Sequence, residues 1–532
     1  MMLKYSKKEK GKRYHVSFFC IFKPLINIFK YIYTREPIKT NNTNMNHRYL
    51  KIGYLSAAVC FTLTACASTH DDDEFSVVPQ DPTEVPTTTQ YGMERQSVLD
   101  YFSNALKGTT GEYGESVALP KEDIEAAKKY VWDIWATSVR RASGERLPTL
   151  SSHYKLDDWG DVTTPDANWK VPEGTMSIFY GSKGESPAAG YPLFLYLHGS
   201  GDDANNEWTT NLSWAQYYND GPSAYFVPKS PQGGTGVRWF QPSKQEKWEQ
   251  MLRQALSSGK IDPNKVYFMG ISEGAYGSQR LASFYADYLA GAGPIAGGEF
   301  LKNCPPENLA NIAFTLQTGA LDESYGRALL TGKVNSELND LEAAHPGYYV
   351  HNVELQAGKG HSCDYTKTTP WLVNYTRNAT PKYVYWENFG MGDINGEPRR
   401  YRETFYNLQI VEPSDDRSDD MRRTAYEMTI NGNTIDLTVN NVTLTETEPA
   451  SLSTGTVNIG VAKAKTPATY GKIRVWLDNA LVDLSQPVVV KVNGVEKFNG
   501  LVEPSTGDLV ESCSLFYDPQ RVFPASVEVS VN

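Results

Sequence analysis

The feature that most constrains the fold is an alternation of short apolar runs and amphipathic segments between residues 173 and 380 of this 532-residue chain. Parallel strands need a crossover, usually a helix, between them, and they are buried on both faces. The alternation therefore predicts a mostly parallel sheet with helices on both faces. The expected strands are residues 176–180, 191–197, 224–227, 266–269, 312–317 and 348–355, and the expected helices are residues 244–257, 273–287 and 325–343.

The flanking segments have other patterns. Apolar residues at helical spacing predict a helix over 121–141, within an N-terminal helical layer at 91–172. After the central region the chain is rich in Val, Thr and Asn, with Asn-Gly turn signals at 431–432 and 493–494. This pattern predicts a C-terminal, all-β, sandwich-like domain over 381–532, so the chain is expected to form more than one domain.

Charge is distributed unevenly and excludes some partners. Residues 1–65 hold 12 Lys and Arg against 2 Asp and Glu, which leaves the remaining 467 residues with a formal charge of −21. Such a charge argues against a nucleic acid or an anionic membrane surface as a partner, and it weakly disfavours a polyanionic pectin. No run of 18 uninterrupted apolar residues occurs, which excludes a polytopic membrane protein.

The basic N-terminal segment has the pattern of a targeting sequence. From Met45 a short basic region precedes an apolar stretch that is too short to span a bilayer, and small residues follow. We expect a lipoprotein signal peptide at 45–65, whereas residues 1–44 are expected to reflect an upstream start codon. The sequence Leu-Thr-Ala-Cys that ends at Cys66 resembles a bacterial lipobox, in which the cysteine becomes lipidated; a plain signal peptide is the alternative.

An acidic and Pro/Thr-rich tether is expected at 66–90. Its Asp-Asp-Asp-Glu cluster at 71–74 resembles the surface-export signal of Bacteroidetes lipoproteins, although a solvated linker would have the same composition. The expected location is therefore the cell outer membrane, with a lipid anchor and a surface-exposed chain. The periplasmic face of that membrane is the alternative.

One junction between a strand and a helix has the pattern of a nucleophile elbow. A buried run leads directly into Gly270-Ile271-Ser272-Glu273-Gly274, and an amphipathic segment follows. The G-x-S-x-G turn is sharp, so small residues are needed on both sides of the serine, whose hydroxyl then stands above the sheet edge. This context predicts that Ser272 is a nucleophile.

A serine nucleophile of this type needs a base later in the chain. Three histidines follow Ser272. His345 lies in a turn before a strand, and His351 lies within that strand, where a packing role is common. His361 follows the strand in a glycine-rich loop, from which a base can reach the serine, and we therefore predict His361 as the base.

The acid and the oxyanion donors are placed by the same reasoning. The strand at 312–317 is followed by Asp322, which can accept a hydrogen bond from the imidazole; Glu323 is the alternative. The strand at 191–197 ends in His-Gly-Ser-Gly, where small residues let the backbone approach a developing oxyanion. We predict the backbone N–H groups of Ser200 and Glu273 as donors, and a structural role for the histidine of that motif.

Six cysteines occur, and three of them lie beyond the targeting segment: Cys304, Cys363 and Cys513. At most one disulfide can form among three cysteines, and Cys304 with Cys363 is the pair to test. No Cys/His cluster with the spacing of a metal site is present, so no metal is expected.

The assembled motifs resemble those of the α/β-hydrolase superfamily, in particular secreted esterases of the feruloyl-esterase and polyhydroxybutyrate-depolymerase kind. They cover less than half of the chain. The second glycine of the elbow is often followed by another glycine in that family, whereas Ala275 stands here, a change without steric consequence. The resemblance implies two-step acyl transfer by Ser272, His361 and Asp322, with no metal or organic cofactor. The motifs that carry it are HGSG at 198–201, GISEG at 270–274, GALD at 319–322 and GKGH at 358–361.

The substrate is less constrained than the chemistry. Export and a β-rich domain favour a carbohydrate esterase that removes acetyl, feruloyl or methyl ester groups from polysaccharides or oligosaccharides of plants. In a glycine-rich loop, Trp239 could stack on a sugar or phenolic ring and Arg238 could meet a uronate carboxylate, although loop packing is the commoner role of such a tryptophan. Two other functions stay open: a serine peptidase of the same fold, and a catalytically silent lipoprotein that binds glycans at the cell surface.

Overall fold

The computed structural model describes residues 88–532 apart from short gaps, together with two short strands near the start of the chain, β1 (Lys8–Glu9) and β2 (Lys12–Arg13). The chain divides into two compact units, Met1–Pro82 and Thr83–Asn532, and the fold below belongs to the second. The signal peptide and Cys66 lie outside the described residues. The gaps are residue 110 and residues 143–146, 148–149, 151–153, 163–173, 202–203, 232–237, 393–398 and 453–454.

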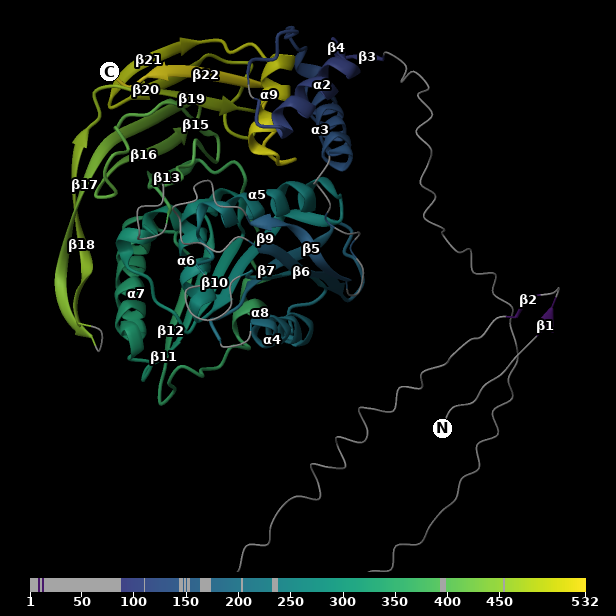
Figure 1. Cartoon of the computed structure of the whole chain (residues 1–532). Helices are drawn as coiled ribbons and strands as arrows, with labels where there is room; N and C mark the ends of the chain where they lie inside the picture. Colours follow the sequence, from purple (N-terminus) through teal and green to yellow (C-terminus); the bar gives the residue numbers. More distant parts are fainter. Residues whose placement is uncertain are drawn as a thin grey trace, which may run out of the picture. The chain divides into compact units, whose positions relative to one another are not determined.

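An eight-stranded sheet forms the centre of the fold, in the order β12-β11-β10-β9-β7-β8-β6-β5 (Figure 1). Six neighbouring strands, β12, β11, β10, β9, β7 and β8, pair in parallel. At one edge of the sheet, β6 pairs antiparallel with both β8 and β5. This arrangement confirms the expected mostly parallel sheet. The strands are β5 (Tyr154–Val162), β6 (Gly174–Lys183), β7 (Tyr191–Leu197), β8 (Ser223–Lys229), β9 (Ile261–Ile271), β10 (Gly291–Ile295), β11 (Ala313–Gly319) and β12 (His351–Gln356).

Both faces of this sheet are covered by helices. Side chains of β7 alternate between two apolar cores, so that Leu193 and Leu195 join one core while Phe194 and Tyr196 join the other. Helices α5, α6 and α7 contribute to the first core, and α4 and α8 to the second. The helices are α4 (Ala204–Tyr217), α5 (Pro242–Ser257), α6 (Glu273–Tyr285), α7 (Arg327–Ala344) and α8 (Thr368–Leu372), with short 3-10 turns η2 (Ala286–Tyr288), η3 (Leu301–Asn303), η4 (Pro306–Leu309) and η5 (Ser324–Gly326).

Two strands of the sheet, β5 and β10, were not expected from the sequence. β10 has the sequence Gly-Ala-Gly-Pro-Ile, which by composition favours a turn. It is nevertheless fully buried between β9 and β11, and its small residues leave room for the side chains of Thr368 and Leu372 from α8. Tertiary packing therefore overrides the local preference.

The predicted helix at 121–141 is present, as the 3-10 turn η1 (Lys121–Asp123) followed by α3 (Ile124–Arg141). It packs against α2 (Arg95–Leu106) and α5, and against α9 (Thr506–Phe516) from the far end of the chain. A short hairpin precedes α2, formed by β3 (Thr89–Gln90) and β4 (Met93–Glu94).

The C-terminal region contains two further sheets. The turn at 493–494 is confirmed, since Val492 pairs with Val495. The other turn lies one residue later than predicted, at residues 432–433, because Asn431 is the last residue of its strand and pairs with Thr434. Helix α9 corrects the expectation of an all-β region. One sheet contains β13 (Tyr383–Asn388), β16 (Arg422–Asn431), β17 (Thr434–Leu452), β18 (Gly455–Pro467), β20 (Val488–Val492) and β21 (Val495–Gly500); the other contains β14 (Thr404–Phe405), β15 (Leu408–Glu412), β19 (Lys472–Leu477) and β22 (Ala525–Ser530).

Buried ion pairs join the C-terminal region to the central sheet region. Asp287, beside α6, accepts hydrogen bonds from Arg402 and Arg521 at 2.9 and 2.5 Å. Asp518 accepts from Arg377 at 2.7 Å and from Arg521 at 2.8 Å. All of these side chains are buried, so each charge depends on its partners. Residues 83–532 accordingly form one compact unit rather than separate modules on linkers.

The three cysteines beyond the targeting segment are unpaired in the structure, which corrects the suggested disulfide between Cys304 and Cys363. Within the described part of the chain, no helix combines the length and the apolar character needed to span a bilayer.

Candidate active site

Ser272 occupies the sharp turn between β9 and α6. Its backbone has φ 56° and ψ −113°, a conformation that is strained for a residue with a side chain. The Ser272 N–H donates to the carbonyl of Ile295 on the neighbouring strand at 2.9 Å, which holds the turn. A Cβ on Gly274 would lie 2.0 Å from the Leu197 carbonyl oxygen, so only glycine fits there. The structure thus has the elbow geometry that the sequence predicted.

The predicted base and acid lie next to Ser272. Nε2 of His361 is 3.0 Å from the Ser272 hydroxyl, and Nδ1 of His361 is 2.6 Å from Oδ2 of Asp322. Asp322 follows β11 and His361 follows β12, so both extend from the carboxyl edge of the sheet, where Ser272 follows β9. The Asp322 side chain is 2% exposed, whereas that of His361 is 45% exposed and accessible to a substrate.

The alternatives weighed for the base and the acid lie elsewhere. Glu323 is exposed at the start of the next turn, while Asp322 is buried against the imidazole. His345 stacks on Tyr383, and His351 contacts Asn339. The geometry therefore favours Asp322 and His361.

Asp322 has a second partner that sequence reasoning did not identify. Nη1 of Arg327, the first residue of α7, donates to Oδ1 of Asp322 at 3.1 Å. The guanidinium is largely buried and lies 5.0 Å from the ring centre of Tyr325. Each carboxylate oxygen of Asp322 thus has its own donor, and this fixes the orientation of the acid toward His361.

The loop that follows β7 passes beside the nucleophile. A Cβ on Gly199 would lie 3.2 Å from the Ser272 Cβ. Ser200 and Glu273, whose N–H groups are the predicted oxyanion donors, line the same cavity as Ser272. Their roles stay predictions, because this proximity does not define an N–H direction.

His198 fixes the end of β7, as the sequence suggested. Its side chain is buried, Nδ1 lies 2.7 Å from the Gly199 carbonyl oxygen, and Nε2 accepts from the Ser230 N–H at 3.0 Å. Burial lowers the pKa of His198 to about 4, so the ring is neutral near pH 7. A neutral ring with both nitrogens occupied is a structural group rather than a base.

The structure corrects the substrate role suggested for Trp239. This side chain is fully buried, and its Nε1–H donates to the His198 carbonyl at 2.8 Å. The indole edge also packs on the His198 ring, with ring centres 4.8 Å apart. Trp239 therefore supports the strand end beneath the oxyanion loop and does not reach a substrate. Its neighbour Arg238 does line the cavity, and its backbone N–H lies 3.4 Å from a Glu273 carboxylate oxygen.

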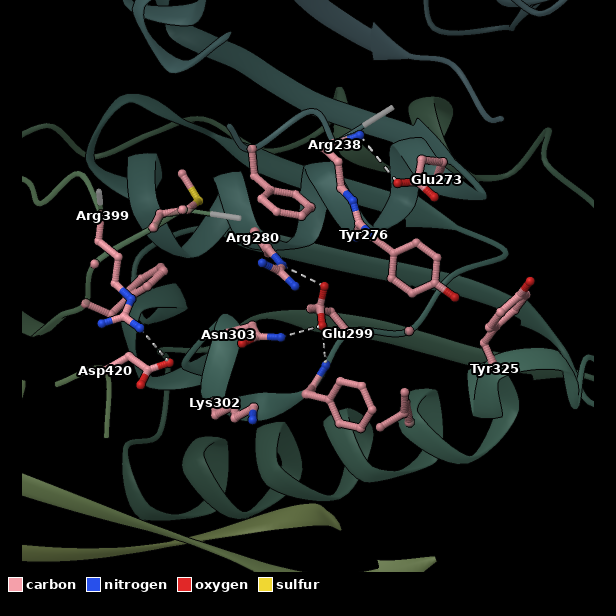
Figure 2. A pocket seen from close by; sticks show the side chains of 18 of the residues that line it. Arg238, Glu273, Tyr276, Arg280, Glu299, Lys302, Asn303, Tyr325, Arg399 and Asp420 are labelled. Carbon is pink, nitrogen blue, oxygen red and sulfur yellow. Dashed lines mark hydrogen bonds and ion pairs between the residues drawn. The ribbon is translucent and has the colours of Figure 1, made fainter. Parts of the chain in front are cut away.

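Ser272 lines a cavity of about 730 Å³. Figure 2 shows the side chains of other residues that line this cavity. One wall is helix α6, which presents Glu273, Tyr276 and Arg280 at helical spacing. Another part of the lining belongs to the C-terminal region, a contribution that sequence reasoning missed because it assigned that region to a separate domain. Its lining residues are Phe389, Gly390, Met391, Gly392, Arg399, Asp420 and Arg423.

No group of three or more His, Cys, Asp or Glu side chains in the described part of the chain is placed to hold a metal ion. The expectation that the protein uses no metal or organic cofactor stays a prediction.

Comparison with known proteins finds partial similarity to hydrolases. No family model matches the chain. It is 27% identical over 171 residues to the poly(3-hydroxyalkanoate) depolymerase C of Paucimonas lemoignei, over 30% of this chain and 40% of the relative. It is 28% identical over 144 residues to an AB hydrolase superfamily protein of Schizosaccharomyces pombe, over 25% of this chain and 39% of the relative. The chain thus spans about two fifths of the length of the curated relatives that it matches.

Among solved structures, an acetyl xylan esterase from Aspergillus awamori is similar to part of the chain. The identity is 14% and the TM-score 0.29, with 40% of this chain and 94% of that chain covered. The strand order, the elbow between β9 and α6 and the two sequence relatives show that the chain has the α/β-hydrolase fold. Its similarities within that class include an ester depolymerase and esterases.

Proposed function

We propose that this protein is a serine carboxylic-ester hydrolase. The observation that carries the proposal is the continuous hydrogen-bonded series from the Ser272 hydroxyl through His361 to Asp322, at 3.0 and 2.6 Å. A serine, a histidine and an orienting carboxylate within hydrogen-bonding distance are the groups that activate a hydroxyl for acyl transfer.

The reaction proceeds in two steps. Nε2 of His361 takes the proton of Ser272 as its oxygen attacks the ester carbonyl carbon, and the N–H groups of Ser200 and Glu273 stabilise the oxyanion. The C–O bond to the alcohol breaks, and the imidazolium gives its proton to the departing oxygen. Water then attacks the acyl-enzyme with His361 again acting as base, and the carboxylic acid leaves while Ser272 regains its proton.

For the substrate, we propose a carbohydrate ester, from which the enzyme removes acetyl, feruloyl or methyl ester groups. The cavity supports this proposal because it is large, open to solvent and lined by many charged and polar side chains, as suits a hydroxyl-rich ligand. The depolymerase among the relatives is named for a polymeric ester substrate. We also propose that lipidated Cys66 anchors the enzyme to the outer membrane, where polysaccharides are accessible.

Incubation of the protein with acetylated xylan, feruloylated arabinoxylan and methylated pectin tests this function. Release of acetate, ferulate or methanol by the wild type and not by a Ser272→Ala variant is expected. A fluorophosphonate probe should label the wild type and fail to label the variant. Absence of both labelling and ester cleavage would contradict the proposal, whereas labelling with cleavage of peptides alone would indicate a peptidase.

A further inference from the structure

The cavity contains charged groups that the proposed reaction does not use. The whole chain has a formal charge of −11, yet basic residues outnumber acidic ones in the cavity lining. The basic residues are Arg238, Arg280, Lys302, Arg327, Arg399 and Arg423, and the acidic residues are Glu273, Glu299 and Asp420. The carboxylates that pair with Lys302, Arg327 and Arg423 are not among the lining residues. The cavity surface is therefore locally more basic than the protein as a whole.

Arg280 is held in one orientation within this cavity. Its Nε–H donates to the Glu299 carboxylate at 2.6 Å, and its guanidinium lies 3.8 Å from the centre of the Phe240 ring. Among the described residues, no acceptor is in hydrogen-bonding position to its two terminal nitrogens. These nitrogens are not fully buried, and because Arg280 lines the cavity they reach its surface.

Glu299 serves to position Arg280. Its other carboxylate oxygen accepts from the Phe300 N–H at 2.9 Å and from the Asn303 side-chain amide at 2.8 Å. The Glu299 side chain is 5% exposed, so its negative charge is stabilised by Arg280 and by these two N–H donors rather than by water. Figure 2 shows this arrangement, with Arg280 beside Glu299 and Asn303. Arg280 is thus built to present a planar pair of N–H donors.

A second guanidinium lines the cavity from the C-terminal region. Arg399 forms a loose ion pair with Asp420, with 3.4 Å between the nearest atoms, and both side chains are partly exposed. Such an exposed pair is weak and can exchange partners when an anion binds. Arg280 and Arg399 therefore offer donors from the two regions of the chain that enclose the cavity.

We propose that Arg280 and Arg399 form a subsite for a carboxylate that the ester substrate carries at a distance from the ester bond. The proposal rests on the esterase function above and narrows it to acidic esters, such as those of glycans that contain uronic acids. Paired terminal N–H groups of arginine match the two oxygens of a carboxylate. A singly charged group also fits better than a phosphate dianion, because Glu299 and Asp420 already offset part of the positive charge.

The helix sets the distance between this subsite and the nucleophile. Arg280 is the eighth residue after Ser272, which at 1.5 Å per residue is about 12 Å between the Cα atoms. Suitable probes are mono-4-nitrophenyl esters of dicarboxylic acids with four to ten carbons. For each length, the methyl-capped neutral diester is the reference.

The wild type is expected to prefer the carboxylate probe at the longer chain lengths, mainly through a lower KM. Because hydrogen bonds to charged groups are strong, an Arg280→Met change should reduce the ratio of kcat/KM for the acidic and neutral probes by about 10- to 100-fold. An Arg399→Met change should reduce the ratio in the same direction but less. Arg422→Met removes the same charge from an exposed side chain outside the cavity lining, and its ratio should equal that of the wild type.

Two additional measurements keep the result decisive. If loss of Arg280 alone prevents folding by leaving Glu299 uncompensated, the double variant Arg280→Met/Glu299→Gln removes both charges. Calorimetric titration of the Ser272→Ala protein with monomethyl suberate detects the subsite without turnover. The double variant Ser272→Ala/Arg280→Met should not bind this ligand.

The outcomes separate the two proposals. Equal activity toward acidic and neutral probes at every length, or an unchanged preference in the Arg280→Met variant, would overturn the subsite while leaving the esterase intact. Failure to cleave any ester, together with no fluorophosphonate labelling, would overturn the esterase. Binding of monomethyl suberate by the Ser272→Ala protein that requires Arg280 would then still support the subsite.

Discussion

At the scale of single residues, the candidate site depends on how Asp322 is held. Oδ2 contacts His361 and Oδ1 accepts from Arg327, so both oxygens of a buried carboxylate are used. The neighbouring Glu323 has the same charge but is exposed to solvent. Position relative to the imidazole, rather than acidity, therefore distinguishes the two residues.

The pair offers a matched test. Asp322→Asn should keep the shape of the side chain but favour the wrong imidazole tautomer, and we expect kcat to fall by about 10⁴-fold. Glu323→Gln removes the same charge one residue away and should leave kcat unchanged. Steady-state rates on a 4-nitrophenyl ester, with fluorophosphonate labelling of Ser272, measure both variants. A similar loss in both variants would contradict the assignment of Asp322.

At the scale of elements, the long hairpin of β17 and β18 connects the C-terminal region to the part of the fold that contains Asp322 and Arg327. It extends alongside α7, and β17 contacts η5, the turn that precedes Arg327 (Figure 1). Lys333 of α7 forms an ion pair with Glu448 of the hairpin at 2.8 Å. At Gly326 the backbone has φ 71°, and an added Cβ would lie 2.8 Å from Leu452. The hairpin thus packs directly against the residue that precedes Arg327.

We therefore expect Gly326→Ala to be more damaging than an ordinary glycine change. The left-handed backbone alone costs about 1–2 kcal/mol with a side chain, and the contact with Leu452 adds to that cost. Gly347, three residues beyond the other end of α7, has φ 91°, and no atom lies within 4 Å of where its Cβ would be. The Gly347→Ala variant should therefore show the backbone cost alone. Urea unfolding gives the stabilities, and kcat should fall only for Gly326→Ala. Equal effects on stability would show that the hairpin contact contributes nothing.

At the scale of the whole molecule, buried charges hold the regions together. Glu387 of β13 accepts from Arg423 of β16 and from Lys463 of β18, each at 2.6 Å, and Lys463 also pairs with Glu307 of η4. Glu387 is fully buried, and Arg423 lines the cavity. The cations Lys463 and Arg423 outweigh the effect of burial and lower the pKa of Glu387 from 4.5 to about 2.

This shift predicts a pH dependence of stability. A carboxyl whose folded-state pKa is lowered stabilises the protein above its unfolded pKa, and that contribution is lost as the pH falls from about 4.5 toward about 2. Glu387→Gln should lower the free energy of unfolding by about 3–5 kcal/mol at pH 7, because buried cations lose their partner, and should weaken the pH dependence in that window. Glu412→Gln, in an exposed pair with Lys472, should change stability by less than about 1 kcal/mol. Denaturation between pH 2 and 7 measures these effects; a parallel loss in both variants would contradict the role of the buried network.

The sequence by itself determined the parallel sheet and the triad. Apolar runs such as 191–197 are dictated by local hydrophobicity, and the glycines around Ser272 are required by a turn that only a few residues form. Because carboxyl ends of parallel strands share one edge, chain order was enough to predict that Asp322 and His361 lie near Ser272. This rule holds for every parallel sheet, so the positions of Asp322 and His361 could be predicted without the structure.

Tertiary structure alone decided the rest. Gly-Ala-Gly-Pro-Ile is a strand only because β9 and β11 flank it, and Trp239 is buried beside the end of β7, where its indole N–H donates to the His198 carbonyl. The partners of Asp322 and Arg280 come from elsewhere in the chain: Arg327 begins the next helix, and Glu299 lies 19 residues beyond Arg280. The wall of the cavity that contains Arg399 comes from a region whose own pattern predicts only strands. Contacts between distant segments depend on packing free energy summed over the whole fold, and no local pattern in the sequence encodes that sum.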